Sequence, residues 1–367
     1  MTSPSSGAAG SGAGGAAPRA AVVGTGLIGS SIGLALRARG WHVTGADHDE
    51  ARAKEALAHG ALDEVGHDPG AEITFVATPV SSVAAAATAA LAGGPGVVTD
   101  VGSVKGPIVA AVGSARFVGG HPMAGSEQEG LQGADAELFA GATWVLTPTA
   151  ATDATAYALV RSVVSSLGAD VVAIPPDRHD ALVALVSHVP HLVAATLMGL
   201  AADGAEEHAQ LLRLAAGGFR DMTRVAAGHP GIWPDICAEN RAAIVAALDS
   251  LVTALGGMRA VVEAGDRPGL LSVLESARAA RTNLPVGVAR SDELSEVRVP
   301  VADRPGVLAE VTTLAGELSV NIADLEIAHS AEGERGVLLL VVDTADAERL
   351  RRALVTRGYR PSTHPLS

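Results

Sequence analysis

Short apolar runs alternate with amphipathic stretches between residues 19 and 174. The runs have the length of buried strands, and the stretches between them hold two to four helical turns. We expect strands at Ala20–Val23, Trp41–Ala46, Ile73–Ala77, Val97–Val101, Arg116–Gly119, Thr143–Leu146 and Asp170–Ile174. We expect helices at Leu27–Arg39, Ala51–His59, Val83–Leu91, Lys105–Val112 and Thr155–Leu167. Strands that alternate with helices predict crossover connections and a mainly parallel sheet.

The pattern changes after Pro175 and Pro176, where a helical period begins and lasts to about Ala280. One apolar stripe contains Ile244, Leu248, Leu251, Val252 and Leu255, which is the spacing of an amphipathic helix. Helices as apolar as these need a partner surface. We therefore expect an all-α domain that pairs with a second protomer in a homodimer.

The C-terminal part repeats a strand–helix–strand pattern twice. Strands are expected at Val297–Val301, Asn321–Ala328, Gly336–Val342 and Tyr359–Ser362, and helices at Gly306–Leu318 and Ala345–Thr356. This βαββαβ order is ferredoxin-like. The expected organisation is a Gly/Ala/Ser-rich tail at 1–18, an α/β dinucleotide-binding (Rossmann-like) domain at 19–175, the helical domain at 176–284 and the small module at 295–367.

Composition narrows the class of protein. The 48% of hydrophobic residues support a core, and a net charge of −14 argues against nucleic-acid binding. A single cysteine, Cys237, rules out a disulfide framework or a multi-cysteine metal site. The N-terminal tail lacks a basic segment, and no apolar run reaches about 18 residues, so we expect a cytoplasmic protein without membrane contact.

The first strand leads into a glycine-rich turn that opens a helix. Gly24, Gly26, Leu27, Ile28 and Gly29 form a G-x-G-x-x-G pattern whose helix N-terminus would face a pyrophosphate. Asp47 ends the second strand, where a carboxylate accepts hydrogen bonds from an adenosine ribose and repels a 2′-phosphate. The pattern predicts NAD in preference to NADP. Asp49 is a nearby competitor for this role.

Two further strand ends carry reactive side chains. Ser103 follows one strand, next to Lys105, which is one of only two lysines in the chain, and His121 follows another. Ligands bind at the carboxyl ends of parallel strands, so we expect these groups to meet there. A hydroxyl, an imidazole and an ammonium suit a redox reaction at a carbinol, with His121 bonding the hydroxyl as hydride leaves.

Polar groups also interrupt the helical stripes. Arg220 and Arg224 could clamp a carboxylate, although either could instead pair with Asp221. His188 and His191 could be core histidines or zinc ligands, but no further ligands with suitable spacing lie nearby, so no metal is expected.

Taken together, the motifs resemble those of the prephenate dehydrogenase family in the form with a C-terminal ACT domain. The resemblance runs from Ala20 to Arg360 and rests on VVGTGLIGSSIG, TDVGSVK, GGHPMAGSE, SHVPH, GGFRDMTRVA, IWPDI and DRPGVLAEV. It implies NAD-dependent oxidative decarboxylation of prephenate to 4-hydroxyphenylpyruvate in tyrosine biosynthesis.

The resemblance also implies roles for single residues. His121 would bond the 4-hydroxyl with Ser103 orienting it, Arg224 would bind a carboxylate, and His191 and Ser187 would line the side-chain end. Ser126 and Glu127 would flank the site, and Trp233 would form a wall. Tyrosine would bind the ACT domain as an effector at residues Asp303, Arg304, Gly306, Asn321 and Ile322.

Three alternatives stay open on the sequence. Arogenate dehydrogenase differs only in the substrate side chain. A β-hydroxyacid or 6-phosphogluconate-type dehydrogenase would need a catalytic lysine in the helical domain, and both lysines precede residue 106. A non-catalytic amino-acid sensor would have lost the polar groups at the strand ends, and these are present.

Overall fold

The computed structural model describes residues 17–125, 130–207, 214–283, 294–302, 304, 306–329 and 335–365. The chain divides into two compact units, residues 1–257 and 258–367, each of which is considered by itself.

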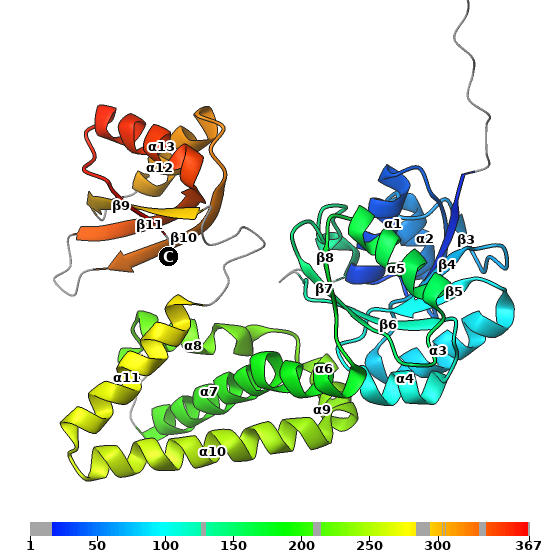
Figure 1. The fold of residues 1–367 in the computed structure, drawn as a ribbon, viewed down its shortest axis with the longest axis horizontal. Coiled ribbons are helices and arrows are strands. Elements are labelled where there is room, and N and C mark those ends of the chain that lie inside the picture. Colours follow the sequence, from blue (N-terminus) through cyan, green and yellow to red (C-terminus); the bar gives the residue numbers. More distant parts are fainter. Residues whose placement is uncertain are drawn as a thin grey trace, which may run out of the picture. The chain divides into compact units, whose positions relative to one another are not determined.

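An eight-stranded sheet forms the centre of the first unit (Figure 1). Its strands are β1 (Arg19–Val23), β2 (His42–Ala46), β3 (Glu64–Val65), β4 (Ile73–Val76), β5 (Val97–Asp100), β6 (Phe117–Pro122), β7 (Thr143–Thr147) and β8 (Asp170–Ala173). Their order is β3-β2-β1-β4-β5-β6-β7-β8, and every pair is parallel except β6 with β7. The expected, mainly parallel Rossmann-like sheet is confirmed, and β3 is an additional short strand.

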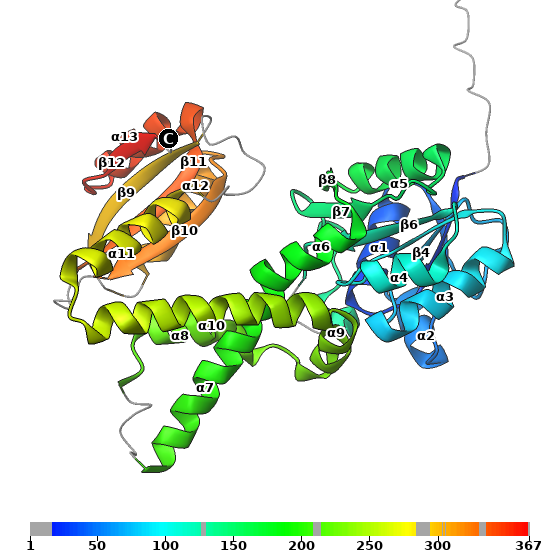
Figure 2. The same ribbon diagram turned by 60° about the horizontal axis from the view of Figure 1, so that its bottom comes forward.

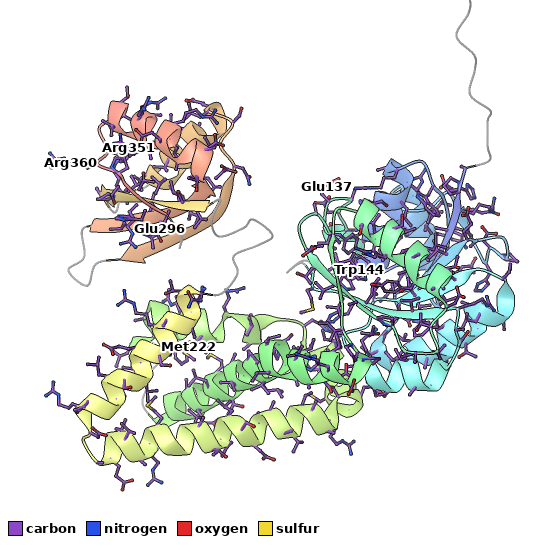
Figure 3. The ribbon with its side chains drawn as sticks, in the orientation of Figure 1. Glu137, Trp144, Met222, Glu296, Arg351 and Arg360 are labelled. Atoms are coloured by element: carbon purple, nitrogen blue, oxygen red, sulfur yellow. The ribbon has the colours of Figure 1, made fainter. Side chains whose placement is uncertain are left out.

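Helices cover both faces of this sheet because neighbouring strand residues point to opposite sides. Phe75 packs in a cluster with α1 (Leu27–Ala38) and α5 (Ala154–Ser166), whereas Val76 packs with α3 (Val80–Gly93) and α4 (Gly106–Val112). A further helix, α2 (Glu50–Ala58), follows β2. Trp144 of β7, labelled in Figure 3, lies fully buried in the first cluster. Its ring meets that of Phe75 edge-on.

The rest of the first unit is helical, as the sequence pattern predicts. It contains α6 (Pro176–Val183), a π-helical turn (Ala184–His188), α7 (Val189–Glu207), α8 (Gly217–Thr223), α9 (Trp233–Glu239) and the start of α10 (Arg241–Glu263). Short 3₁₀ turns occupy Gly130–Gly133, Arg224–Ala227 and Pro230–Ile232. A hydrogen bond of 2.6 Å from Ser81 to Asp235 joins the start of α3 to α9.

Two of the described helical stretches, Pro176–Gly204 and Arg241–Glu263, are long and apolar enough to cross a membrane if length and composition alone are considered. Several apolar side chains of α10, among them Val245, Val252 and Leu255, are at least half exposed. A helix with such a face is equally suited to pairing with a second protomer.

The second unit contains α11 (Arg267–Thr282) and a four-stranded antiparallel sheet (Figure 2). The remaining elements are β9 (Leu294–Ala302), α12 (Val307–Glu317), β10 (Ile322–His329), β11 (Arg335–Asp343), α13 (Thr344–Thr356) and β12 (Ser362–Pro365). The strand order β10-β11-β9-β12 is that of a ferredoxin-like βαββαβ unit. Apolar residues of α12 and α13 pack against β9 and β11.

The last strand begins later than expected. The expected fourth strand is present, but its predicted bounds, Tyr359–Ser362, were wrong, because the chain is still turning at Tyr359, whose N–H bonds to the carbonyl of Leu354. Gly358, with φ of +87°, makes this turn at the end of α13. The strand β12 then pairs with β9 from Ser362 to Pro365.

A buried ion pair joins the carboxyl ends of β5 and β6. The ammonium of Lys105 contacts Asp100 and donates to the carbonyl of Gly120 at 2.8 Å, and all of its side chain is buried. Asp100 in turn accepts the N–H groups of Gly102 and Gly120 at 2.9 and 3.1 Å. The pair therefore fixes the backbone immediately before His121.

Lys105→Met should lower the free energy of unfolding by about 3–5 kcal/mol, because it leaves the Asp100 carboxylate buried without a counter-charge. The matched control is Lys54→Met, since Lys54 is exposed on α2 and pairs with Glu50. Urea unfolding of both variants measures the difference. Equal stability of the two would show that the buried pair does not support the fold.

Candidate active site

A cavity of about 1130 Å³ opens at the carboxyl ends of the strands in the first unit. Its lining runs from the glycine-rich turn after β1, past Ser103 and His121, to Ser187, His188 and Trp233 of the helical part. This volume suits a dinucleotide together with a small substrate. The cavity brings together groups that lie more than 200 residues apart in the sequence.

The glycine-rich turn has the geometry of a dinucleotide cradle. Gly24 has φ of +95°, and a Cβ at Gly29 would lie 1.9 Å from the carbonyl oxygen of Gly24. At Gly26, by contrast, a Cβ would meet no atom within 4 Å, so space is left beside the backbone at the start of α1. Leu27 and Ile28, which also line the cavity, begin that helix, whose free N–H groups suit a phosphate.

Asp47 reaches the same end of the cavity but is already held by its own loop. Its carboxylate accepts the N–H of Thr25 at 2.8 Å, the Thr25 hydroxyl at 3.1 Å and the N–H of Asp49 at 3.0 Å, and it contacts His48 at 2.9 Å. Burial acts to raise its pKa, but these bonds outweigh burial and lower it. A ribose hydroxyl would share or replace one contact, and that with the exposed His48 is the easiest to replace.

Asp49, the competing acid, has a structural task. Its side chain accepts the N–H of Ala51 at 3.0 Å and caps the start of α2.

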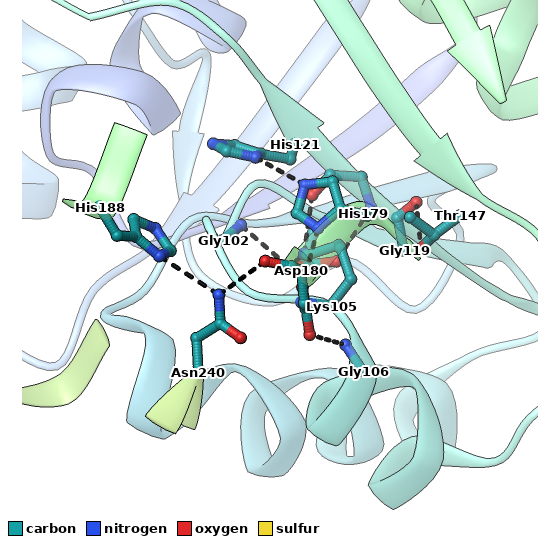
Figure 4. A network of polar contacts seen from close by, with 12 residues as sticks. Gly102, Lys105, Gly106, Gly119, His121, Thr147, His179, Asp180, His188 and Asn240 are labelled. Atoms are coloured by element: carbon teal, nitrogen blue, oxygen red, sulfur yellow. Dashed lines mark hydrogen bonds and ion pairs between the residues drawn. The ribbon is translucent and has the colours of Figure 1, made fainter. Parts of the chain in front are cut away.

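His121 heads a chain of hydrogen bonds that leads away from the cavity (Figure 4). Its Nδ1 lies 3.0 Å from Nε2 of His179, and Nδ1 of His179 lies 2.8 Å from a carboxylate oxygen of Asp180. Asp180 also accepts the N–H groups of Lys105 and Gly106 at the start of α4, at 2.8 and 2.7 Å. His179 and Asp180 are buried, so water does not compete with these bonds.

These hydrogen bonds determine which nitrogen of His121 carries a proton. A carboxylate only accepts, so His179 donates from Nδ1, and in the neutral ring its Nε2 then accepts. His121 must then donate from Nδ1, and its Nε2 keeps a free electron pair on the other side of the ring. Burial, with Lys105 and His179 adding to it, lowers the pKa of His121 well below 6.5. The site therefore presents a neutral imidazole base.

The helical wall of the cavity is built around Trp233. The ring of His191 stacks on Trp233 at 3.7 Å, and His188 meets it edge-on at 6.1 Å. Nδ1 of His188 lies 3.2 Å from the amide nitrogen of Asn240 (Figure 4). Ser187 and His188 belong to the π-helical turn, a feature that is frequent at functional sites.

Not all of the predicted site residues line the cavity. Ser103, His121 and Ser187 line the cavity, whereas Arg224 and His191 are not among its lining residues. Ser126 and Glu127 lie outside the described residues. The prediction that the Lys105 ammonium joins the hydroxyl and imidazole at the strand ends was wrong, because burial and its bond to Asp100 turn it into the protein.

The predicted effector residues lie in the second unit. Arg304 forms two bonds of 2.8 and 2.9 Å to Glu310, which also accepts the Tyr359 hydroxyl at 2.6 Å. Gly306 precedes α12 with φ of +89°, and Asn321 and Ile322 lie at the start of β10. Asp303 lies outside the described residues.

Sequence reasoning missed His179 and Asp180, and it named Asn240 among the polar groups of the helical part without giving it a role. All three are buried polar residues, His179 and Asp180 on α6 and Asn240 between α9 and α10, and only their contacts across 52 to 75 residues of sequence reveal a role. The available signal was the adjacent pair His179-Asp180, three residues after the double proline. Within the described ranges, no group of three or more His, Cys, Asp or Glu side chains is placed to hold a metal ion.

Comparisons with known proteins give one consistent family. Residues 32–173 match the model of the prephenate dehydrogenase nucleotide-binding domain, and residues 175–276 match that of the prephenate dehydrogenase dimerization domain. The chain is 31% identical over 341 residues to the prephenate dehydrogenase of Bacillus subtilis, which covers 89% of this chain and 92% of the relative.

Two solved structures share the fold. Synechocystis arogenate dehydrogenase has a TM-score of 0.63 and 32% identity, covering 72% of this chain and 98% of its own. Prephenate dehydrogenase from Aquifex aeolicus, in complex with hydroxyphenyl propionate and NAD+, has a TM-score of 0.69 and 28% identity, covering 73% of this chain and 98% of its own.

Gly26→Ala and Gly29→Ala should fail in different ways. A methyl group at Gly29 collides with the backbone of Gly24, so that variant should lose about 1–3 kcal/mol or more of stability. A methyl group at Gly26 meets only open space, so thermal unfolding without ligand should be unchanged while the Kd of NAD rises at least tenfold. Tight NAD binding by the Gly26 variant would contradict the proposed cradle.

Proposed function

The chain belongs to the prephenate dehydrogenase family and is an NAD-dependent oxidoreductase; from this premise we propose that it converts prephenate to 4-hydroxyphenylpyruvate and CO2. The observation that carries the proposal is the position of His121 in the cavity wall with the dinucleotide cradle, its Nδ1 held by His179. The product lies on the route to tyrosine. NAD, when bound, accepts the hydride.

The proposed reaction needs a group that takes up charge at the substrate hydroxyl. His121 accepts the hydrogen bond of the 4-hydroxyl at Nε2 and draws the proton towards itself as the hydride leaves C4. Electrons of the breaking bond to the ring carboxylate make the ring aromatic, and the proton returns to the phenol oxygen. His179 and Asp180 stabilise the positive charge on His121 during this step, as a carboxylate supports histidine in other enzymes.

The remaining predicted residues keep their proposed roles. Ser103 orients the hydroxyl beside His121, Arg224 binds a substrate carboxylate, and His191 and Ser187 line the side-chain end, with Ser126 and Glu127 flanking the site. Arogenate dehydrogenase activity is the second candidate, because one of the similar solved structures is that of an arogenate dehydrogenase. An assay of NADH and NADPH formation with prephenate and arogenate, each with NAD and NADP, separates the two; inactivity in all four reactions would reject both.

We also propose that the enzyme is a cytoplasmic homodimer. The exposed apolar residues of α10 and the match of residues 175–276 to a dimerization domain support pairing through the helices. Analytical ultracentrifugation tests this, and a monomer at micromolar concentration would contradict it.

The second unit is proposed to be an ACT regulatory domain that binds tyrosine. Its βαββαβ order supports this. The alignment with the relative from Bacillus subtilis covers 89% of this chain, so it extends into the second unit. The turn through Asp303, Arg304 and Gly306, together with Asn321 and Ile322, would form the effector site.

His121→Asn should lower kcat by about 100-fold or more and leave the Kd of NAD nearly unchanged, because the lone pair that serves the hydroxyl is lost. The control is His59→Asn, an exposed histidine at the end of α2. Protonation blocks the same lone pair, so activity falls as pH drops through the pKa of His121. The acid limb of kcat/KM should therefore lie well below pH 6.5. Normal turnover by His121→Asn would contradict the assigned role.

Tyrosine should inhibit NADH formation by the full chain, and Asn321→Ala should raise the half-inhibitory concentration roughly tenfold through loss of one hydrogen bond. Asn283→Ala, at the end of α11, is the control. If tyrosine does not inhibit, or inhibits all three proteins equally, this effector site is wrong.

A further inference from the structure

His188 has a buried nitrogen without a partner. Its side chain is 1% exposed, it lines the cavity, and its Nε2 has no hydrogen-bond partner among the described residues. An unsatisfied buried donor or acceptor costs about 1–3 kcal/mol. A buried polar group without a partner calls for an explanation, and next to a cavity an atom of a ligand can supply it.

The neighbours of His188 show that this nitrogen is a donor. Nδ2 of Asn240 lies 3.0 Å from the backbone oxygen of Asp180, which can only accept, so this atom is the amide nitrogen. The same nitrogen lies 3.2 Å from Nδ1 of His188 and donates its second hydrogen there. Nδ1 therefore accepts, and in the neutral ring the proton is on Nε2, the nitrogen that lacks a partner.

The ring stays neutral at physiological pH. Burial lowers the pKa of His188 to about 4, and the nearby Asp180 carboxylate only partly opposes this. His188 thus offers one N–H group without a positive charge. His121, in contrast, has an Nε2 that accepts a hydrogen bond. Both histidines are linked to Asp180, His121 through His179 and His188 through Asn240.

We propose that His188 is a substrate-binding residue whose Nε2–H donates to an oxygen of the ring carboxylate, the group that departs as CO2. The inference rests on the proposed function, because it requires a substrate with a hydroxyl and a carboxylate on one ring. His121 holds the hydroxyl and His188 the carboxylate of that ring. The bond orients the carboxylate and is given up when the carbon–carbon bond breaks.

A neutral donor suits a carboxylate that must lose its charge. A guanidinium or ammonium at the same place would stabilise the carboxylate before decarboxylation, and an unpaired buried cation would remain afterwards. The N–H of His188 supplies direction with a smaller stabilisation of the ground state.

The test compares two ligands that differ at the ring carboxylate. Prephenate has it, and 4-hydroxyphenylpyruvate lacks it, while both have the same side-chain carboxylate. Kd values are measured by calorimetry with NADH in place of NAD, so that no turnover occurs. The proteins are the wild type, His188→Leu, His188→Gln, which keeps an N–H donor, and the exposed-loop control His67→Leu.

We expect His188→Leu to weaken prephenate binding roughly tenfold or more, the loss of one bond to a charged group. Binding of 4-hydroxyphenylpyruvate should change less than about threefold, and His188→Gln should recover part of the loss. Unchanged Kd of NADH shows that each variant has kept its fold, and His188→Gln carries the test if His188→Leu does not fold.

Equal weakening of both ligands would place the donor at the shared side chain and overturn the proposal. No weakening of either would remove His188 from the substrate site. A wild type that neither binds nor oxidises prephenate would reject the proposed function as well, whereas an active wild type with equal effects rejects this assignment alone.

Discussion

The carboxylate of Asp180 is the contact on which the candidate site depends. It accepts two backbone N–H groups at the start of α4 and one from the ring of His179, so it ties the helical part of the first unit to the sheet. The backbone oxygen of the same residue accepts from Asn240. One buried residue thus sets the orientation of two imidazoles, His121 through His179 and His188 through Asn240. Charge and hydrogen-bond direction in the cavity wall follow from this anchor.

The wall works by keeping histidines neutral and aligned. In water an imidazole exchanges protons and rotates freely, and its two nitrogens are equivalent partners for a ligand. Here burial disfavours the charged ring, and fixed partners distinguish the nitrogens of His121 and His188. The cavity gains an acceptor from one and a donor from the other, and the cost of ordering them is met during folding. The buried pair of Lys105 and Asp100 adds to this by fixing the backbone before His121.

The sequence was a good guide to whatever depends on local pattern. Strand and helix positions in the first unit, the glycine cradle and the order of the C-terminal elements follow from periodicity and turn residues. The antiparallel direction of β7 did not, because a buried apolar run reads the same in either direction. The two-residue strand β3 carries no period at all. The inward turn of Lys105 and the bonds of Asp180 depend on residues brought together by folding, which one sequence does not reveal.

The π-helical turn Ala184–His188 restricts where residues can be inserted or deleted in this chain. A π turn contains one residue more than the α-helical turn it replaces, and each residue advances a helix by about 100°. Deleting a single residue there would restore regular α-helix and rotate α7 against everything before it, so Ser187 and His188 would leave the cavity. Homologous chains with this site should therefore tolerate insertions in the loops on either side but keep constant spacing from Asp180 to His188.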